Sequence, residues 1–152
     1  FNTNTDLLLY LAARSENIEI LKKFYKKKII LIDRFTDSTI AYQHYGFGAN
    51  LSLIKNINRY LLGDFKVSFT FTNIVSQKNL LKRLKSRKKL NRYDQFKLKF
   101  YDKVQKGFLK LAKKNNKFYQ IINSNLDIEI NKKIIINKID QLIGKRWTHQ
   151  IK

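Results

Sequence analysis

Apolar side chains recur at helical spacing along most of the chain. In residues 5–15 and 17–27 this spacing places them on one face of a helix, and Thr5 is expected to cap the first of the two. Further helices are predicted over 38–44, 50–62, 76–88, 94–114 and 126–143. The pattern therefore predicts a domain built largely of amphipathic helices.

Polar residues and glycines mark where several of these helices begin and end. Asn50 and Ser76 stand at starts, where a side-chain oxygen accepts hydrogen bonds from first-turn N–H groups. Gly63 and Gly144 each follow a helical pattern, and glycine is favoured just past a helix end. These boundaries depend on local chemistry alone.

Three short runs, 29–32, 69–74 and 118–122, predict strands. The first is continuously apolar, which is typical of a strand buried on both faces of a parallel sheet. Because strands alternate with helices, we expect an α/β domain with a parallel sheet. Ligands of such sheets bind beyond the carboxyl ends of the strands, and Asp33 and Arg34 directly follow the first run.

The composition fits one domain with a real core. The chain has 152 residues, of which 43% are hydrophobic and 13% aromatic. No apolar run is long enough for a transmembrane helix, so no membrane partner is expected. The absence of cysteine excludes disulfides and thiolate metal sites, and it is typical of proteins in a reducing compartment.

The formal net charge of +21 has two interpretations. Such a charge attracts polyanions, which would indicate a nucleic-acid-binding protein. However, 25 of the 32 basic residues are lysines spread along the chain, and Lys, Asn, Ile, Phe and Tyr are all abundant and have AT-rich codons. Because the aromatic residues follow core spacing, we favour composition bias, with nucleic acid bound only non-specifically. The nucleic-acid-binding protein stays open as an alternative.

Hydrogen-bonding side chains follow the charged pair Asp33-Arg34. Within ten residues the chain offers hydroxyls, a phenol and an amide, in Ser38, Thr39, Tyr42 and Gln43. Such groups can hold a base and a sugar, while an arginine fork can bind phosphate and an aspartate can bind Mg²⁺. A plain surface turn is the alternative interpretation of the charged pair.

Other arginines also stand out, because the chain has only seven. Arg14 lies four positions after Tyr10, so the two share a helix face and could offer a guanidinium and an aromatic plate. Three more, Arg83, Arg87 and Arg92, fall within ten residues of a basic stretch. A mobile arginine segment is one way to stabilise charge in phosphoryl transfer, although a solvated basic face explains the lysines among them.

Taken together, these segments resemble the thymidylate kinase family. The similar stretches are LLLYLAAR at 7–14, IDRFTDSTIAYQ at 32–43, LLGDF at 61–65 and LKRLKSRKKLNRYDQ at 81–95, and the resemblance runs from about residue 6 to residue 143. The second stretch is the most specific. The resemblance implies transfer of the ATP γ-phosphoryl to dTMP with Mg²⁺, giving dTDP, by a cytoplasmic homodimer.

The resemblance also implies roles for individual residues. Tyr10 would stack on the base, Arg14 and Arg34 would hold the dTMP phosphate, and Asp33 would lie near Mg²⁺ and the transferred phosphoryl group. Ser38, Thr39 and Gln43 would surround the base, and Tyr42 would lie beside the sugar. Arg83, Arg87 and Arg92 would belong to a lid, at about 85–93, that closes on ATP.

The front of the family pattern has no counterpart in this sequence. The family begins with a strand, a glycine-rich phosphate loop and a second strand, and no stretch here matches G-x-x-x-x-G-K followed by Ser or Thr. We therefore expect a three-layer parallel-sheet P-loop nucleoside-monophosphate kinase fold that lacks its first two strands and P-loop helix, over residues 1–144 with a tail at 145–152. In the family the lost first strand lies between the strands matching 29–33 and 69–74. The 152 residues alone are expected to be inactive, and a non-catalytic kinase remnant stays open as an alternative.

Overall fold

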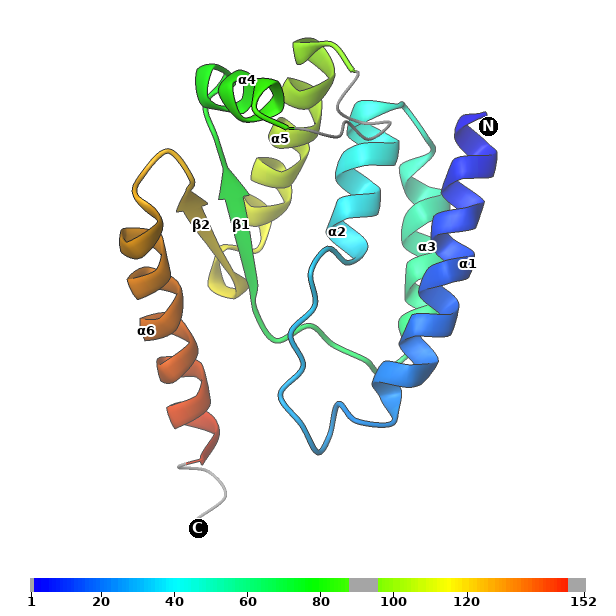
Figure 1. The fold of residues 1–152 in the computed structure, drawn as a ribbon. Coiled ribbons are helices and arrows are strands. Elements are labelled where there is room, and N and C mark those ends of the chain that lie inside the picture. Colours follow the sequence, from blue (N-terminus) through cyan, green and yellow to red (C-terminus); the bar gives the residue numbers. More distant parts are fainter. Residues whose placement is uncertain (1, 88–95, 148–152) are drawn as a thin grey trace.

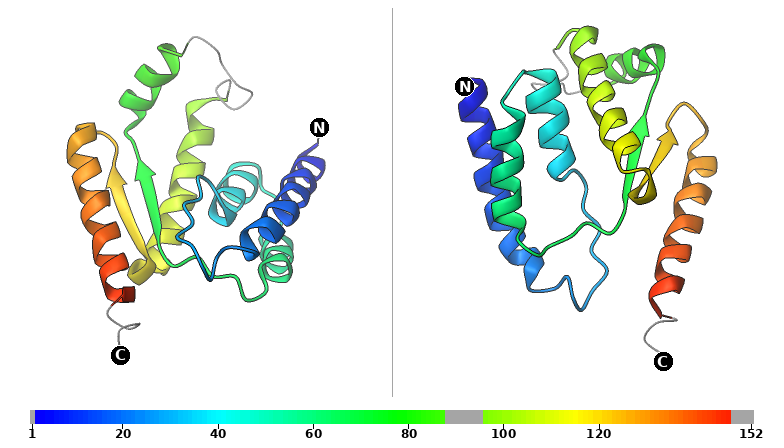
Figure 2. Two further views of the ribbon diagram at one scale, coloured as in Figure 1. Left: turned by 60° about the horizontal axis from the view of Figure 1, so that its bottom comes forward. Right: turned by 180° about the vertical axis from the view of Figure 1, so that it is seen from behind.

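The computed structural model describes residues 2–87 and 96–147, with side chains up to Gly144. Its elements in chain order are α1 (Thr3–Lys22), α2 (Thr36–Thr39), the π-helical η1 (Ile40–Gly46), α3 (Leu51–Leu62), β1 (Thr70–Ile74), α4 (Gln77–Lys85), α5 (Leu98–Lys114), the 3₁₀ turn η3 (Asn116–Phe118), β2 (Tyr119–Asn123) and α6 (Ile128–Trp147). Helices α1 and α3 lie side by side at one end of the molecule, and α6 runs beside β2 at the other (Figures 1 and 2).

Strands β1 and β2 form a parallel pair, as the sequence predicts. The register places Thr70 opposite Tyr119 and Ile74 opposite Asn123. Parallel neighbours need a crossover connection, and α4 and α5 supply it. Thr72 of β1 and Ile122 of β2 are buried. The described residues thus form an α/β domain with a small parallel sheet and mostly helical surroundings.

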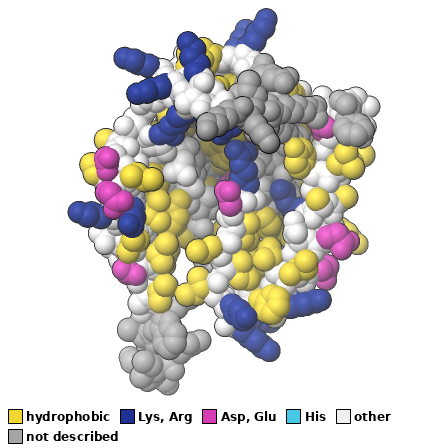
Figure 3. All heavy atoms as spheres, in the orientation of Figure 1, with side chains coloured by type: hydrophobic (Ala, Val, Ile, Leu, Met, Phe, Trp, Pro, Cys, Tyr) yellow, Lys and Arg dark blue, Asp and Glu magenta, His cyan; other side chains and the backbone are white. Residues whose placement is uncertain are grey.

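The predicted strand at 29–32 is wrong. This segment is in no sheet, and three of its four apolar side chains are exposed, Leu31 by 82%, while Ile30 is half-buried. Within the described part of the chain, β1 and β2 pair only with each other, so the backbone of 29–32 has no strand to bond to. An apolar run predicts burial only where other elements cover it. Figure 3, drawn in the orientation of Figure 1, shows hydrophobic side chains exposed across the middle of the molecule, with Lys and Arg among those at the upper and lower edges.

Two helix predictions also need correction. The stretches 5–15 and 17–27 form the single helix α1, because no glycine or proline interrupts the chain between them, and this helix ends at Lys22. Its cap is Asn2 instead of Thr5, with the Asn2 Oδ1 accepting from the Thr5 N–H at 2.9 Å. Gly144 does not end the last helix, since the helical backbone of α6 continues to Trp147. A glycine inside a helix costs about 1 kcal/mol relative to alanine but does not stop it.

Three predicted boundary residues are confirmed, whereas α2 begins at Thr36 instead of 38, α4 ends at Lys85 instead of 88 and α5 begins at Leu98 instead of 94. Asn50 Oδ1 accepts from the Leu53 N–H at 3.0 Å, and the Ser76 side chain accepts from the Asn79 N–H. Gly63 follows α3 with a φ of 52°, in the left-handed region that glycine adopts without steric cost.

Segment η1 is fixed by close packing on α5. A Cβ at Gly107 of α5 would lie 2.5 Å from the Tyr45 Cδ2, and one at Gly46 would lie 2.6 Å from the Phe100 Cε2. Both glycines therefore allow the helix backbones to approach closely. On its other side Ile40 joins the core formed with α1 and α3, whose buried members include Leu7, Leu11, Ala49 and Ile54. Residues 40–46 are held from both sides.

Candidate functional site

Arg14 joins three elements through its guanidinium. Its Nη1 donates to the Asn58 Oδ1 on α3 at 3.1 Å, and its Nη2 donates to the Phe35 carbonyl at 3.1 Å and to the Thr39 Oγ1 at 2.8 Å. The guanidinium carbon also lies 5.3 Å from the centre of the Phe35 ring, within cation–π range. The structure thus brings together Arg14 and Thr39, two of the residues predicted to form one site.

Donors remain at this position beyond those three bonds. A guanidinium carries five N–H groups, so Nε and one Nη1 hydrogen of Arg14 lie outside the bonds described above. Beside them, the Asn58 Nδ2 is buried and has no hydrogen-bond partner in the described part of the chain. A buried amide N–H without an acceptor is costly. Burial lowers the pKa of Arg14, and the Asp37 carboxylate partly offsets that effect.

A hydrogen bond between Asp37 of α2 and Tyr119 of β2 connects the helical part of the molecule with the sheet. The Tyr119 hydroxyl donates to the Asp37 Oδ2 at 2.7 Å, and Tyr119 lies opposite Thr70 in the parallel register. Burial raises the pKa of Asp37, while the Tyr119 bond and the Arg14 charge act in the opposite direction. Burial and the neighbouring carboxylate raise the pKa of the Tyr119 hydroxyl. Asp37 therefore lies between the Arg14 charge and the sheet.

Replacing Asp37 with asparagine is expected to change how stability depends on pH. The folded pKa of Asp37 is raised above its ordinary value of 3.8, so the folded state binds this proton more tightly than the unfolded state does. The contribution to stability is therefore full below pH 3.8 and is lost as the pH rises through the folded pKa. As the pH rises through the folded pKa of Asp37, the free energy of unfolding of the asparagine variant should increase relative to that of the unmodified chain. Urea denaturation of both chains at several pH values measures this difference in the free energy of unfolding. A decrease in the stability of the asparagine variant relative to the unmodified chain with rising pH would contradict the prediction.

Arg34 and Asp33 lie in the exposed turn before α2. Arg34 has a φ of 60°, the one positive φ among the described non-glycine residues, and such backbone is strained. Its guanidinium lies 5.2 Å from the centre of the Tyr42 ring on η1. The turn thus directs a second arginine toward the segment that carries Tyr42 and Gln43. The Asp33 side chain is exposed beside it.

The other predicted acceptor-site residues occupy α1, α2 and η1. Gln43 is buried, Ser38 and Tyr42 are half-buried, and Tyr10 is exposed on α1 one turn before Arg14. The substrate roles predicted for these side chains stay predictions.

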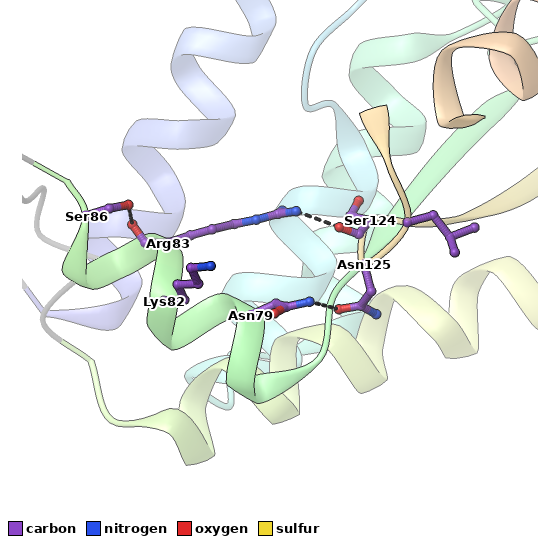
Figure 4. A pocket seen from close by; sticks show the side chains of 7 residues that line it. Asn79, Lys82, Arg83, Ser86, Ser124 and Asn125 are labelled. Carbon is purple, nitrogen blue, oxygen red and sulfur yellow. Dashed lines mark hydrogen bonds between the residues drawn. The ribbon is translucent and has the colours of Figure 1, made fainter. Parts of the chain in front are cut away.

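Arg83 lies in a different place. It belongs to α4 and donates from Nη2 to the Ser124 carbonyl, in the β2–α6 turn, at 2.6 Å (Figure 4). Next to it, the Asn79 Nδ2 donates to the Asn125 Oδ1 at 2.9 Å. Together with nearby residues they line a pocket of about 330 Å³, whose lining is Asn79, Lys82, Arg83, Ser86, Ser124, Asn125 and Leu126.

The remaining lid residues are only partly described. Arg87 follows α4 and is exposed, whereas residues 88–93 of the predicted lid, Arg92 among them, lie outside the described residues. The structure therefore separates two sets of predicted arginines. Arg14 and Arg34 lie around α2 and η1, while Arg83 contacts the β2–α6 turn.

Sequence reasoning missed Asn58, Asp37 and Tyr119. Asn58 had a signal, since it lies four positions after Ile54 and so interrupts the buried face of α3 with an amide. Asp37 stands next to Ser38, and its carboxylate could have been added to the candidate cluster. Tyr119 had no signal, because its partner Asp37 is 82 positions away in the sequence.

Metal ligands are few in the described residues. No group of three or more His, Asp or Glu side chains there could hold a metal ion. Mg²⁺ commonly takes one or two protein carboxylates and otherwise binds waters and substrate phosphates, so the exposed carboxylate of Asp33 beside Arg34 is compatible with it. Among the described helices, none is both long and apolar enough to cross a membrane.

Fold and site together define a class of protein. The structure is similar to that of thymidylate kinase from Ehrlichia chaffeensis, with a TM-score of 0.70 and 28% identity, over 91% of this chain and 67% of that one. The fold is therefore that of the P-loop nucleoside-monophosphate kinases, as the sequence predicts.

The family follows from the sequence comparisons. A family model described as thymidylate kinase matches residues 1–135. Thymidylate kinase of Trichodesmium erythraeum is 42% identical over 127 residues, which are 82% of this chain and 56% of that protein. The Geobacillus enzyme is 32% identical over 93% of this chain and 70% of its own length. The chain belongs to the thymidylate kinase family. It spans 56% of the length of the Trichodesmium protein and 61% of the length of thymidylate kinase from Kosmotoga olearia, which is 32% identical.

Proposed function

We propose that this chain supplies the acceptor site of a thymidylate kinase, which transfers the γ-phosphoryl group of ATP to dTMP and releases dTDP and ADP. The observation that carries the proposal is the placement of two arginines around one short segment. Arg14 bonds to Thr39, and Arg34 lies over Tyr42. A phosphate monoester needs such paired positive groups, and the hydroxyl and amide side chains between them suit a base and sugar.

The chemistry requires no protein nucleophile. Phosphoryl transfer is catalysed mainly by holding donor and acceptor in line and by neutralising the charge on the moving group. Arg34 would hold the dTMP phosphate from the turn, while the remaining N–H groups of Arg14 would orient it from α1. Asp33 would take part in holding Mg²⁺, which neutralises phosphate charge when bound. The basic pocket at Arg83 is suited to the anionic donor nucleotide, with Arg87 and Arg92 following it on the lid.

The exposed segment 29–32 also fits this proposal. In the family pattern a strand lies between the segments that match 29–33 and 69–74. Such a strand would cover the apolar side chains of 29–32 and bond to their backbone. It also leads into the phosphate loop, so the same piece of chain would complete both the sheet and the ATP site.

The test compares the 152-residue chain with a fusion, hereafter the phosphate-loop fusion. In it, the residues that precede the matched region in the Geobacillus relative are joined to Phe1. In an ADP-release assay with Mg²⁺, ATP and dTMP, we expect turnover by the fusion and none by the chain alone. The reason is that the amides and lysine of a phosphate loop hold the β- and γ-phosphates, and no match to that loop occurs in this sequence.

Two controls make the result specific. Alanine at the loop lysine should abolish the activity of the fusion, and circular dichroism should show that each protein is folded. Turnover by the chain alone that scales with its concentration would contradict the expectation. A folded fusion without dTMP-dependent turnover would contradict the proposed function.

A further inference from the structure

The short helix α2 is held from two opposite sides. From the helical side, Arg14 bonds to the Phe35 carbonyl and the Thr39 Oγ1, at the two ends of the segment 35–39. From the sheet side, the Tyr119 hydroxyl bonds to the Asp37 Oδ2 at the middle of the same segment. Segment η1 continues α2 without a break, so whatever fixes α2 also fixes the start of η1.

The Tyr119 hydroxyl is itself fixed in place. Tyr119 is the first residue of β2 and lies opposite Thr70 in the parallel register, so the backbone that carries its ring is fixed by the sheet. The ring is half-buried, so its rotation is restricted. A donor held by its strand can position the carboxylate that it meets.

We propose that Tyr119 and Asp37 are positioning residues for the acceptor site: their hydrogen bond sets where α2 and the start of η1 lie on the sheet. Neither residue needs to touch the substrate. They act through Thr39 and Tyr42, and this part of the inference rests on the proposed function. The pair also connects the side of the molecule that carries Arg14 with the strands that lead to α4 and α6.

Loss of the bond has a definite physical consequence. When the Tyr119 hydroxyl is removed, the half-buried Asp37 carboxylate loses its hydrogen-bond donor but is still attracted by the positive charge of Arg14. A carboxylate that has lost its hydrogen-bond donor is expected to move toward the remaining positive charge. That movement competes with Thr39 and the Phe35 carbonyl for the Arg14 N–H groups. The segment that carries the substrate side chains would therefore shift.

The first test needs no substrate and uses the 152-residue chain. Hydrogen exchange followed by mass spectrometry is measured for the unmodified chain, Tyr119→Phe and the control Tyr60→Phe, whose ring is 85% exposed on α3. In Tyr119→Phe, amides of 36–46 should exchange about tenfold faster, as expected for the loss of one hydrogen bond to a charged group, while amides of 51–62 stay unchanged. Tyr60→Phe should match the unmodified chain. Unchanged exchange over 36–46 in Tyr119→Phe would overturn the proposal.

The second test uses kinetics of the phosphate-loop fusion. Tyr119→Phe should raise the KM for dTMP about tenfold and leave kcat and the KM for ATP within about twofold, because it disturbs the acceptor segment alone. Asp37→Asn keeps an oxygen that accepts from Tyr119, so its KM should stay near the unmodified value, whereas Asp37→Ala should resemble Tyr119→Phe. General destabilisation would not produce this rescue. If Asp37→Asn is as impaired as Asp37→Ala, the positioning role is wrong.

The two tests separate this proposal from the proposed function. An unmodified fusion that is folded but does not use dTMP would refute the proposed function, and hydrogen exchange would still decide whether the pair holds α2. A fusion that uses dTMP with the same KM in the unmodified and Tyr119→Phe forms would refute the positioning role alone.

Discussion

Replacing Arg34 with alanine in the phosphate-loop fusion is expected to lower kcat/KM for dTMP by roughly thirty- to a thousand-fold, corresponding to about 2–4 kcal/mol of transition-state stabilisation. Arg34 lies in the turn before α2, with a backbone conformation that few non-glycine residues adopt and with its guanidinium over the Tyr42 ring. An arginine fork placed there can donate two parallel hydrogen bonds to a phosphate. Loss of a charge-assisted contact that strengthens during transfer affects the rate directly.

Lys26→Ala is the matched control for this variant. Lys26 is also an exposed cation near an aromatic ring, with its Nζ 5.9 Å from the centre of the Tyr25 ring, but it belongs to the lysine-rich turn after α1. A solvated surface charge of this kind should contribute less than about 1 kcal/mol, so kcat/KM should fall less than about fivefold. The kinetics are measured at one ionic strength. Equal activity of the two variants would place the acceptor phosphate elsewhere.

Replacing Arg14 with alanine is expected to lower the free energy of unfolding by about 2–4 kcal/mol, because several bonds from one charged group are lost together. Its guanidinium holds α1 to α3 through Asn58 and to the α2 segment through Phe35 and Thr39. Without it, the buried Asn58 side chain has lost its hydrogen-bonding partner. In the fusion, the KM for dTMP should rise with little change in kcat if Arg14 holds ground state and transition state alike.

Two further variants distinguish the effect of the Arg14 charge from the effect of its hydrogen bonds. Arg59→Ala removes an exposed arginine of α3 and should change stability by no more than about 0.5 kcal/mol. Arg14→Lys keeps the positive charge but lacks the planar fork that reaches three acceptors, so it should recover only part of the stability. Thermal or urea unfolding measures both. If Arg14→Ala unfolds like Arg59→Ala, the hydrogen bonds of Arg14 do not hold the helices together.

Features that depend on neighbouring residues were predictable from the sequence. The caps at Asn50 and Ser76 and the left-handed Gly63 follow from side-chain oxygens and a missing Cβ, which act within one turn. The two parallel strands and the two helices between them, α4 and α5, follow from hydrophobic spacing. Local patterns predicted the wrong boundary at Thr5 and Gly144. Asn2 caps α1 instead of Thr5, and the single glycine at 144 does not stop α6.

Motif reasoning identified part of the candidate site. It grouped Arg14 with Thr39, and the structure places a hydrogen bond between them. It also grouped Arg83 with Arg87 and Arg92 of the predicted lid, and the structure adds that the Arg83 side chain donates to the Ser124 carbonyl in the β2–α6 turn. A motif shows which chemistry a segment carries, whereas the direction of a long side chain depends on acceptors that other segments provide.

The sequence by itself determined the class of fold, several helix boundaries and the family, since these depend on periodicity, capping and residue order. Only the tertiary structure decided the exposure of 29–32 and the connections of Arg14, Asp37 and Tyr119. The apolar run at 29–32 becomes a buried strand only if other strands bond to its backbone, and the described chain provides none there. Tyr119 meets Asp37 across 82 positions because the parallel register of β2 on β1 places the start of β2 beside α2. Contacts between distant segments depend on how elements pack, and no local pattern contains that information.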